Sequence, residues 1–219
     1  MLLDKNERGL NKVYDDIESH CGVMAGLYPL DLAGASIDDY EQLAHTVEQE
    51  FGQLTDLLHS AASIGQLAPF LQIEPTEWQK CFTTNLHGPV FLTKALLPLL
   101  RSSAATGNII FTLDSKSRAY WTSYAATKAA LQAVVETLAD ELDGDRDKNQ
   151  KLRVRCNSVN PVKLRSMLRT SAYPGEDPLS VPAAQSKLQT YLYLLSNEAE
   201  DINGQCIEAN SNDNSAITE

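Results

Sequence analysis

Long apolar runs and positive charge are the two features that this sequence lacks most clearly. No stretch reaches the roughly 18 apolar residues of a membrane span, because Lys94 and Pro98 interrupt the longest candidates. Lysine and arginine number 18 against 29 aspartate and glutamate residues, so the formal net charge is -11. A general nucleic-acid binder and a protein that docks on anionic lipid both need a basic surface, so the charge argues against both classes. A small anionic ligand can still bind to local backbone N–H groups.

Cysteine is scarce, and its spacing matches no metal or redox motif. The four cysteines form no CxxC pair and have no histidine at metal-ligand spacing, and the N-terminus carries no secretory signal. They are Cys21, Cys81, Cys156 and Cys206. We therefore expect reduced core thiols, no metal site and a cytoplasmic location. The sequence also has no GxSxG run for a serine-hydrolase elbow and no GxxxxGKS/T phosphate loop.

The composition is that of a globular protein, with 43% apolar and 21% charged residues in 219 positions. Apolar patterns predict strands and helices that alternate along the chain, as in βαβ units. Strands are expected at 1–3, 24–32, 54–59, 107–113, 152–159 and 205–208, and helices at 7–21, 36–51, 76–100, 122–142 and 182–195. We expect one α/β domain over 1–219, with a polar C-terminal tail at 210–219. Its sheet should be mostly parallel, doubly wound and covered by helices on both faces.

Polar and small residues follow several of the predicted strands. In open parallel sheets, ligands bind at the carboxyl ends of the strands. The residues predicted there are Asp4, Asp31, His59-Ser60-Ala61-Ala62, Leu113-Asp114-Ser115 and Asn160-Pro161. His59 is expected to be structural, although it could face the site.

Tyr124 and Lys128 belong to a YAATK run near the start of an alanine-rich helix. Their i, i+4 spacing puts both side chains on one helix face. A lysine ammonium favours the phenolate and lowers the pKa of a neighbouring tyrosine, which could then exchange a proton with a substrate oxygen. Taken alone the pair is weak, because tyrosine and lysine at this spacing usually cover helix surface.

The chain resembles the short-chain dehydrogenase/reductase family through short motifs that follow one order from about Met1 to Ala209. Each motif is weak alone, whereas the shared order is specific. In chain order they are Leu2-Leu3-Asp4-Lys5-Asn6-Glu7, Asp31-Leu32, His59-Ser60-Ala61-Ala62, Asn85, the YAATK run with Lys128, Asn160-Pro161 and Asn203-Gly204-Gln205.

The resemblance implies a Rossmann-like fold and a nicotinamide cofactor lying across the strand ends. It implies that Tyr124 is the general acid/base. Lys128 would bind the nicotinamide ribose and lower the tyrosine pKa, and Asn85 would support a water-linked proton path. The family also uses a serine to polarise the substrate oxygen, and Ser115 is the candidate for that role.

Further residues are implied to bind the cofactor. Asp4 would hydrogen-bond the adenosine ribose and favour NAD over NADP, although Lys5 beside it tolerates a phosphate. Asp31 would lie beside the adenine and Ser166 near the carboxamide. The remaining implied cofactor contacts are Ser60, Ala61, Ala62, Lys128 and Pro161.

The sequence departs from the family pattern in four places. The opening strand and the glycine-rich turn TGxxxGxG, which anchor the pyrophosphate, are absent from the 219 residues. Either the chain is truncated or it has abandoned dinucleotide binding, and we expect the 219-residue chain to bind NAD(P)H weakly or not at all. Leu113-Asp114 stands where the family pattern has a pair of serines. A carboxylate at this place would repel an oxyanion and raise the tyrosine pKa. Ser60-Ala61-Ala62 replaces the usual Asn-Ala-Gly, and Val162 replaces a glycine.

Two functions remain open at this point. The first is an oxidoreductase that transfers hydride between NAD(H) or NADP(H) and a small carbonyl or alcohol. The second is a degenerate, non-catalytic family member with a structural or interaction role.

The helices at 76–100 and 122–142 carry more apolar positions than one sheet face needs, and the resemblance implies pairing through them into a homodimer or homotetramer. The substrate depends on the variable segment 165–182.

Overall fold

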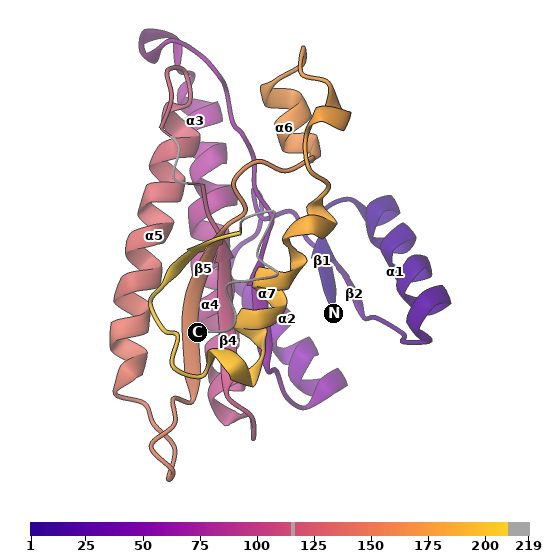
Figure 1. Ribbon diagram of the computed structural model, residues 1–219, viewed down its shortest axis with the longest axis vertical. Helices are drawn as coiled ribbons and strands as arrows, with labels where there is room; N and C mark the ends of the chain where they lie inside the picture. Colours follow the sequence, from indigo (N-terminus) through magenta and orange to yellow (C-terminus); the bar gives the residue numbers. More distant parts are fainter. Residues whose placement is uncertain (115–116, 210–219) are drawn as a thin grey trace.

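The computed structural model describes residues 1–114 and 117–209 as alternating parallel strands and helices (Figure 1). The predicted α/β class is confirmed by this element order. The candidate Ser115 and the predicted tail at 210–219 lie outside the described residues. No helix in the described part of the chain is long and apolar enough to cross a membrane.

The described strands form two parallel sheets. The smaller sheet pairs β1 (Leu2–Asp4) with β2 (Leu27–Pro29). The larger sheet has the order β3-β4-β5-β6, with β3 at Asp56–His59, β4 at Gly107–Thr112, β5 at Val154–Asn160 and β6 at Cys206–Glu208. Since every pairing in it is parallel, the carboxyl ends of its four strands lie along one edge.

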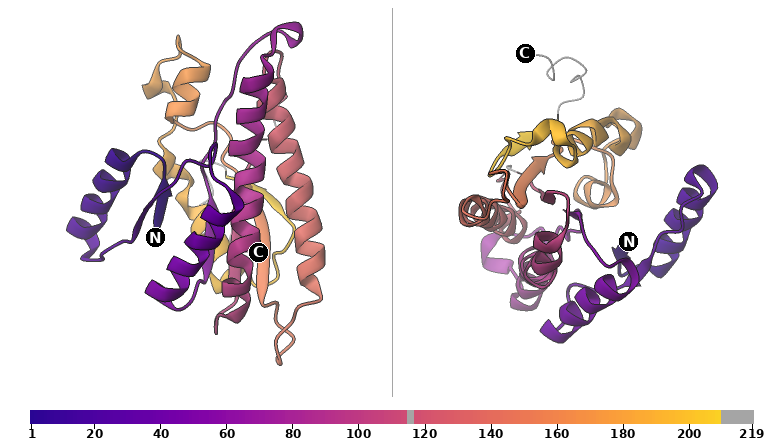
Figure 2. Two further views of the ribbon diagram at one scale, coloured as in Figure 1. Left: turned by 180° about the vertical axis from the view of Figure 1, so that it is seen from behind. Right: turned by 90° about the horizontal axis from the view of Figure 1, so that it is seen from below.

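Helices follow most of the strands. They are α1 (Glu7–Cys21), α2 (Ile37–Phe51), α3 (Pro75–Phe82), α4 (Gly88–Ser102), α5 (Thr122–Asp143), α6 (Met167–Ala172) and α7 (Leu188–Leu195). Figure 2 shows α1 with β1 and β2 at one side of the molecule and α5 at the opposite side. The predicted start of α2 is confirmed, because Ser36 and Asp39 form a capping box there.

The core lies on both faces of the larger sheet, as the doubly wound prediction requires. Ile109 and Phe111 of β4 are fully buried in a cluster with residues of α4 and α5. Ile110, between them, belongs to a second cluster with Leu194 of α7. Side chains that alternate along β4 therefore bury both faces, which is why the strand reads as a continuous apolar run.

A buried arginine attaches α7 to the sheet. Arg155 on β5 donates to the main-chain carbonyls of Leu194, Ser196 and Ala199 and to the side-chain oxygen of Asn108. These bonds satisfy carbonyls at and beyond the end of α7, which would otherwise be buried without partners. The position of α7 is thereby tied to β5, beside the strand ends.

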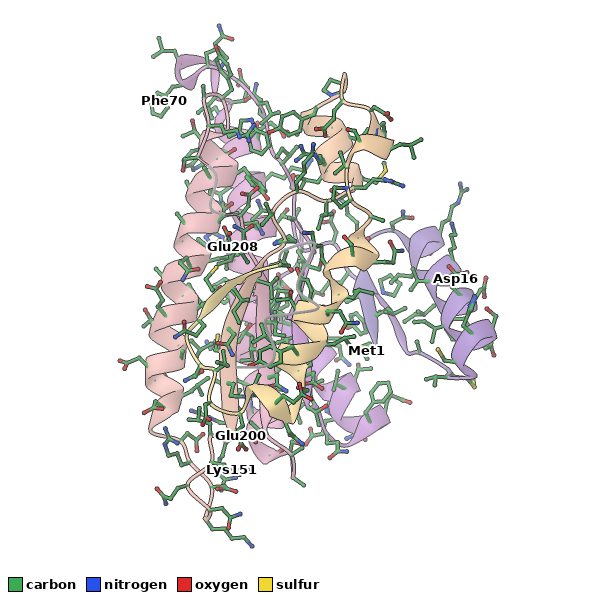
Figure 3. The ribbon with its side chains drawn as sticks, viewed as in Figure 1. Met1, Asp16, Phe70, Lys151, Glu200 and Glu208 are labelled. Atoms are coloured by element: carbon green, nitrogen blue, oxygen red, sulfur yellow. The ribbon has the colours of Figure 1, made fainter. Side chains whose placement is uncertain are left out.

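The charged turn before β5 marks the end of the molecule opposite the strand ends. Figure 3 shows Lys151 and Glu200, which form an ion pair, at one end of the long axis and Phe70 at the other. Since β5 follows Lys151, it runs from that end toward the end where α6 and Phe70 lie (Figures 1 and 3). Leu71, next to Phe70, is 97% exposed at the tip of its loop.

The structure corrects three predictions. The segment 76–100, predicted as one helix or as two abutting helices joined at Pro89, is instead divided by a π-helical turn at Thr83–His87. Pro89 sits in the first turn of α4, where proline costs no hydrogen bond. Helix α6 was not predicted; Ser166 caps its N-terminus by accepting from the N–H of Arg169. Of the four free thiols, Cys21 and Cys206 are exposed and not in the core.

Candidate active site

A cavity of about 440 Å³ opens at the carboxyl ends of β3, β4 and β5. Three segments that follow these strands line it: Ser60 and Ala62, then Leu113 and Asp114, then Pro161 and Val162. Helix α5 contributes Tyr124 and Lys128, and α6 and α7 cover the opposite side. The structure thus brings most of the residues expected at the strand ends to one cavity, as the parallel sheet requires.

Tyr124 and Lys128 lie on consecutive turns of α5, and each side chain is only 5% exposed. The Lys128 ammonium donates to the carbonyl oxygen of Thr112 at 2.7 Å and lies 5.8 Å from the centre of the Tyr124 ring. The Trp121 ring meets Tyr124 edge to face, with 5.7 Å between ring centroids. The phenol and the ammonium are therefore fixed side by side in the cavity wall.

The electrostatics of the pair differ from the prediction. Burial raises the pKa of Tyr124, and the negative charge of Asp114 raises it further. Burial also lowers the pKa of Lys128 to about 8. The pKa of Tyr124 is thus shifted upward, opposite to the lowering expected from Lys128, because burial is the largest cause of the shift. The part that Lys128 plays in the tyrosine pKa stays a prediction. At neutral pH Tyr124 is a protonated phenol, which is a proton donor.

Asn85 is fully buried in the π-helical turn and does not line the cavity. Its amide oxygen accepts from the N–H of Ser63 at 2.7 Å, and its amide nitrogen donates to the carbonyl of Ser63 and to the hydroxyl of Thr127. The Thr127 hydroxyl in turn donates to the carbonyl of Tyr124. Asn85 therefore links the segment after β3 to the first turns of α5. Its predicted part in a proton path stays a prediction.

Two predicted cofactor residues, Asp4 and Asp31, lie outside the cavity lining. Each carboxylate accepts a local main-chain N–H, from Asn6 at 2.8 Å and from Ala33 at 3.0 Å. Such bonds shape the turns that follow β1 and β2. Ala61, between two lining residues, is not itself part of the lining.

The family of the chain follows from comparisons with known proteins. The short chain dehydrogenase family model matches residues 1–177. The chain belongs to this family. The oxidoreductase YciK of Escherichia coli, whose activity is uncharacterised, is 33% identical over 212 residues, which are 95% of this chain and 81% of YciK.

Solved structures agree with the assignment. A protein assigned as a short chain dehydrogenase from Pseudomonas syringae superposes with a TM-score of 0.89 at 38% identity, over 95% of this chain and 83% of the other. One from Shigella flexneri, solved with NADP, gives a TM-score of 0.88 at 32% identity over 95% and 84% of the two chains. One from Escherichia coli, solved with NADPH, gives the same four values. The protein is thus a short-chain dehydrogenase homologue with a Rossmann-like fold and oxidoreductase ancestry.

Within this short-chain dehydrogenase, Val162 is strained. Its φ of 58° lies in the left-handed region, which β-branched residues rarely adopt. The strain of about 1–3 kcal/mol typical of such a residue is held by a bond from the Val162 N–H to the side-chain oxygen of Asn160 at 3.0 Å. Val162, which replaces the family glycine, therefore keeps the left-handed backbone conformation that glycine would adopt without strain.

Aromatic and cationic residues cover the cavity, and the sequence analysis missed their role. Trp121 and Tyr173 line it and contact each other, and Arg118 donates to the Tyr173 hydroxyl. Arg169 lies over the Tyr173 ring at 4.6 Å and forms a two-pronged ion pair with Glu176 at 2.6 and 2.9 Å. A usable signal was present, since Trp121 precedes Tyr124 by one helical turn and Arg169 precedes Tyr173 at i, i+4 spacing.

His59 lies near the site without facing substrate space. Its ring stacks on Phe111 with 4.6 Å between centroids, and its Nε2 is 2.8 Å from the Thr93 hydroxyl. Burial first, and the charge of Lys128 second, lower the pKa of His59 to about 3. These contacts hold the imidazole ring of His59 in its neutral form. They confirm the prediction that His59 has a structural role.

Proposed function

We propose that this protein is a nicotinamide-dependent oxidoreductase that transfers hydride between the cofactor and a small carbonyl or alcohol substrate. The observation that carries the proposal is the pairing of Tyr124 and Lys128 at the strand-end cavity, in a chain of the short chain dehydrogenase family. When bound, the cofactor supplies or accepts the hydride.

The cavity residues fit the nicotinamide end of such a cofactor. Ser60 and Ala62 are small and leave room for a planar ring, while Lys128 offers a buried ammonium to ribose hydroxyls. Pro161 and Ser166 lie on the same cavity and suit the carboxamide side. The adenosine end would extend toward the turns after β1 and β2, where Asp4 and Asp31 lie.

Tyr124 would deliver the proton. Its raised pKa keeps the hydroxyl protonated at neutral pH, so Oη can donate to the substrate heteroatom as the carbon receives hydride. The same raised pKa makes the phenolate a strong base that quickly regains a proton from solvent.

Deuterium transfer tests the proposal directly. Purified protein would be mixed with NADPH deuterated at the reactive carbon and with a panel of aldehydes, ketones and imines. We expect deuterium in at least one product, detected by mass spectrometry, together with NADPH binding followed by nicotinamide fluorescence. Absence of transfer across the panel would favour the non-catalytic homologue instead.

The cofactor proposed here is NADP(H), in contrast to the NAD preference expected from Asp4. Neighbours of known structure were solved with NADP and NADPH. The Asp4 carboxylate already accepts the Asn6 N–H, and Lys5 follows it in the turn before α1. A lysine at this place can pair with the additional phosphate of NADP.

Reversing the charge of Lys5 should therefore reverse the cofactor preference. In Lys5→Glu we expect the ratio of NADPH to NADH affinity to fall by about tenfold or more, since the phosphate would meet a carboxylate. Fluorescence titration with both cofactors measures the ratio. Lys12→Glu makes the same charge change on exposed α1 surface and should leave it unchanged. An unaltered ratio in Lys5→Glu would place phosphate recognition elsewhere.

We also propose that the protein is a homo-oligomer paired through α4 and α5. The two helices form an apolar groove of about 470 Å³ whose lining includes Val90, Leu97, Val134 and Leu138. Small and apolar side chains on this surface suit close approach of helices from a second copy.

A carboxylate in this groove should separate the subunits. We expect Val134→Glu to lower the particle mass to that of a monomer, because pairing would bury an uncompensated charge. Light scattering at micromolar concentration gives the mass. Leu192→Glu, which puts the same charge on exposed α7 surface, is the control and should keep the wild-type mass. A wild-type monomer would refute the pairing.

A cytoplasmic location forms part of the same proposal. The four thiols are free, and Cys21 and Cys206 are exposed to solvent. Exposed free thiols persist in reducing compartments and are oxidised or paired elsewhere.

A further inference from the structure

Lys187 is a buried lysine in the wall of the cavity, where it directly precedes α7 and is only 4% exposed. Its ammonium donates to the main-chain carbonyl of Ala209, the residue after β6, at 2.5 Å. The Ala209 N–H in turn donates to the carbonyl of Asn160 at the end of β5. The Lys187 ammonium is therefore fixed at the strand-end edge of the sheet, where the cavity opens.

Tyr191 connects this part of the cavity wall to Lys128. It lies one helical turn after Lys187 and also lines the cavity. Its hydroxyl is 3.1 Å from the hydroxyl of Thr112, whose carbonyl accepts from the Lys128 ammonium. A substrate whose reacting carbon lies at Tyr124 thus shares one cavity with the Lys187 ammonium.

The described residues that line this cavity carry more positive than negative charge. The positive ones are Lys128, Arg165, Arg169 and Lys187. The carboxylate in this lining, that of Asp114, interacts electrostatically with Lys128 and Arg169, and Arg169 also pairs with Glu176. The Lys187 ammonium is instead bonded to a carbonyl, which carries no net charge.

A buried ammonium held by a neutral acceptor favours a bound anion. Removing a charge from water costs free energy, and a carbonyl dipole offsets that cost less well than an opposite charge does. The ammonium has three N–H groups, of which the bond to Ala209 uses one. The net charge of -11 does not prevent anion binding, because the low-dielectric walls of a cleft focus the field of the charges that line it.

The place of Lys187 separates it from the phosphates expected of the cofactor. The proposed adenosine end extends toward β1 and β2, which pack beside β3, since Leu3 and Tyr28 share an apolar cluster with Leu57. In the larger sheet β3 and β6 are the two opposite edge strands. Because Lys187 is bonded to the residue after β6, its charge lies at the substrate end of the cavity and not at the phosphate end.

We propose that the substrates of this cavity carry a carboxylate or phosphate group away from the reacting carbon, and that Lys187 is the residue that selects it. The inference rests on the proposed function and specifies the substrate class, a small anionic carbonyl compound or alcohol. Arg165 lines the cavity at an exposed position and adds positive charge where such a substrate enters.

Two ligands that differ in charge alone test the inference without turnover. p-Toluate carries a carboxylate, and p-toluamide has nearly the same shape without a charge. We expect the wild type to bind p-toluate at least about tenfold more tightly. Tryptophan fluorescence reports the binding, since Trp121 lines the cavity. The preference should persist when the titrations are repeated with saturating NADP, because the cofactor phosphates lie elsewhere.

Neutral variants of Lys187 should abolish this preference. Lys187→Gln removes the charge while its amide can still donate to the Ala209 carbonyl, and Lys187→Met is a second neutral variant. Lys187→Arg keeps the charge and should retain the preference. Lys80→Gln, which removes a lysine from exposed α3 surface, is the matched control and should retain it as well.

Rates with NADPH add a second readout. The wild type should reduce 4-formylbenzoate with a kcat/KM at least about tenfold above that for 4-formylbenzamide. The difference should lie in KM, because Lys187 contacts the anionic group equally before and during hydride transfer. In Lys187→Gln the two values of kcat/KM should become similar.

Equal affinity of the wild type for p-toluate and p-toluamide would overturn the inference, and so would an unchanged ratio in folded Lys187→Gln. Loss of the preference once NADP is bound would overturn it too, because the positive charge would then serve the cofactor phosphates. Failure of the proposed function is a separate result: deuterium transfer would then be absent for every substrate, anionic ones included, while the ratio of the two ligand affinities would still decide the part played by Lys187.

Discussion

Replacing Tyr124 by phenylalanine should lower the rate of NADPH-dependent reduction by about 10²–10⁴-fold, the usual worth of a positioned proton donor. The substitution removes the hydroxyl and keeps the ring, so the edge-to-face contact with Trp121 remains. Because the proton is transferred only in the transition state, kcat and kcat/KM should fall together while KM stays near its wild-type value. Steady-state kinetics on the best substrate of the panel gives both numbers.

The stability of this variant is the necessary companion measurement. The free energy of unfolding in urea should change little, since the removed hydroxyl belongs to the cavity wall. Tyr40→Phe provides the control: it removes a phenol hydroxyl from a tyrosine that is 2% exposed on α2, away from the cavity. Tyr40→Phe should keep the wild-type rate. If Tyr124→Phe also keeps it, the YAATK run is a packing feature and another group supplies the proton.

Local signals predicted helices α1, α2 and α5 and the adjacency of Tyr124 and Lys128 well. Helix α1 begins and ends as its sequence indicates, because Asn6 caps its N-terminus and Gly22 takes the left-handed conformation at its end. The i, i+4 spacing is equally local. Such signals act within a few residues, so one sequence is enough to detect them.

Features that depend on distant partners were missed. The π-helical turn accompanies the bonds from Asn85 to Ser63 and to Thr127, which are 22 and 42 positions away. The cover of the cavity needs Tyr173 to meet both Arg118 and Trp121 across the strand ends. No local pattern announces which of these side chains the fold will bring together.

Burial explains the error in the Tyr124 pKa. The prediction weighed the neighbouring charges of Lys128 and Asp114 and left the burial of the phenol out. In the structure both groups are removed from water, and this cost raises the pKa of Tyr124 and lowers that of Lys128. The carboxylate of Asp114 was anticipated with the correct sign, because its position follows from the adjacent strand.

Lys128 should make the stability of the protein depend on pH. Burial lowers its pKa from the usual 10.5 to about 8, so the charged form is disfavoured in the folded state. Between these two values the unfolded chain binds more protons at this residue than the folded chain does, and the free energy of unfolding rises with pH there. The destabilisation is therefore fully present below pH 8 and is relieved between about pH 8 and 10.5.

Comparison with Lys128→Met isolates this contribution, because all other titrating groups are shared. The stability of the wild type relative to the variant should rise on the order of 3 kcal/mol between pH 7 and 10.5, measured by urea unfolding. At pH 7 the variant should be the more stable protein despite losing the bond to Thr112, while its reduction rate and its affinity for NADPH both fall. Lys80→Met, on exposed α3 surface, should run parallel to the wild type at every pH. If the stability of Lys128→Met also runs parallel to that of the wild type across pH, the Lys128 ammonium of the wild type is hydrated in solution. The active site then holds no charge at an energetic cost at this position.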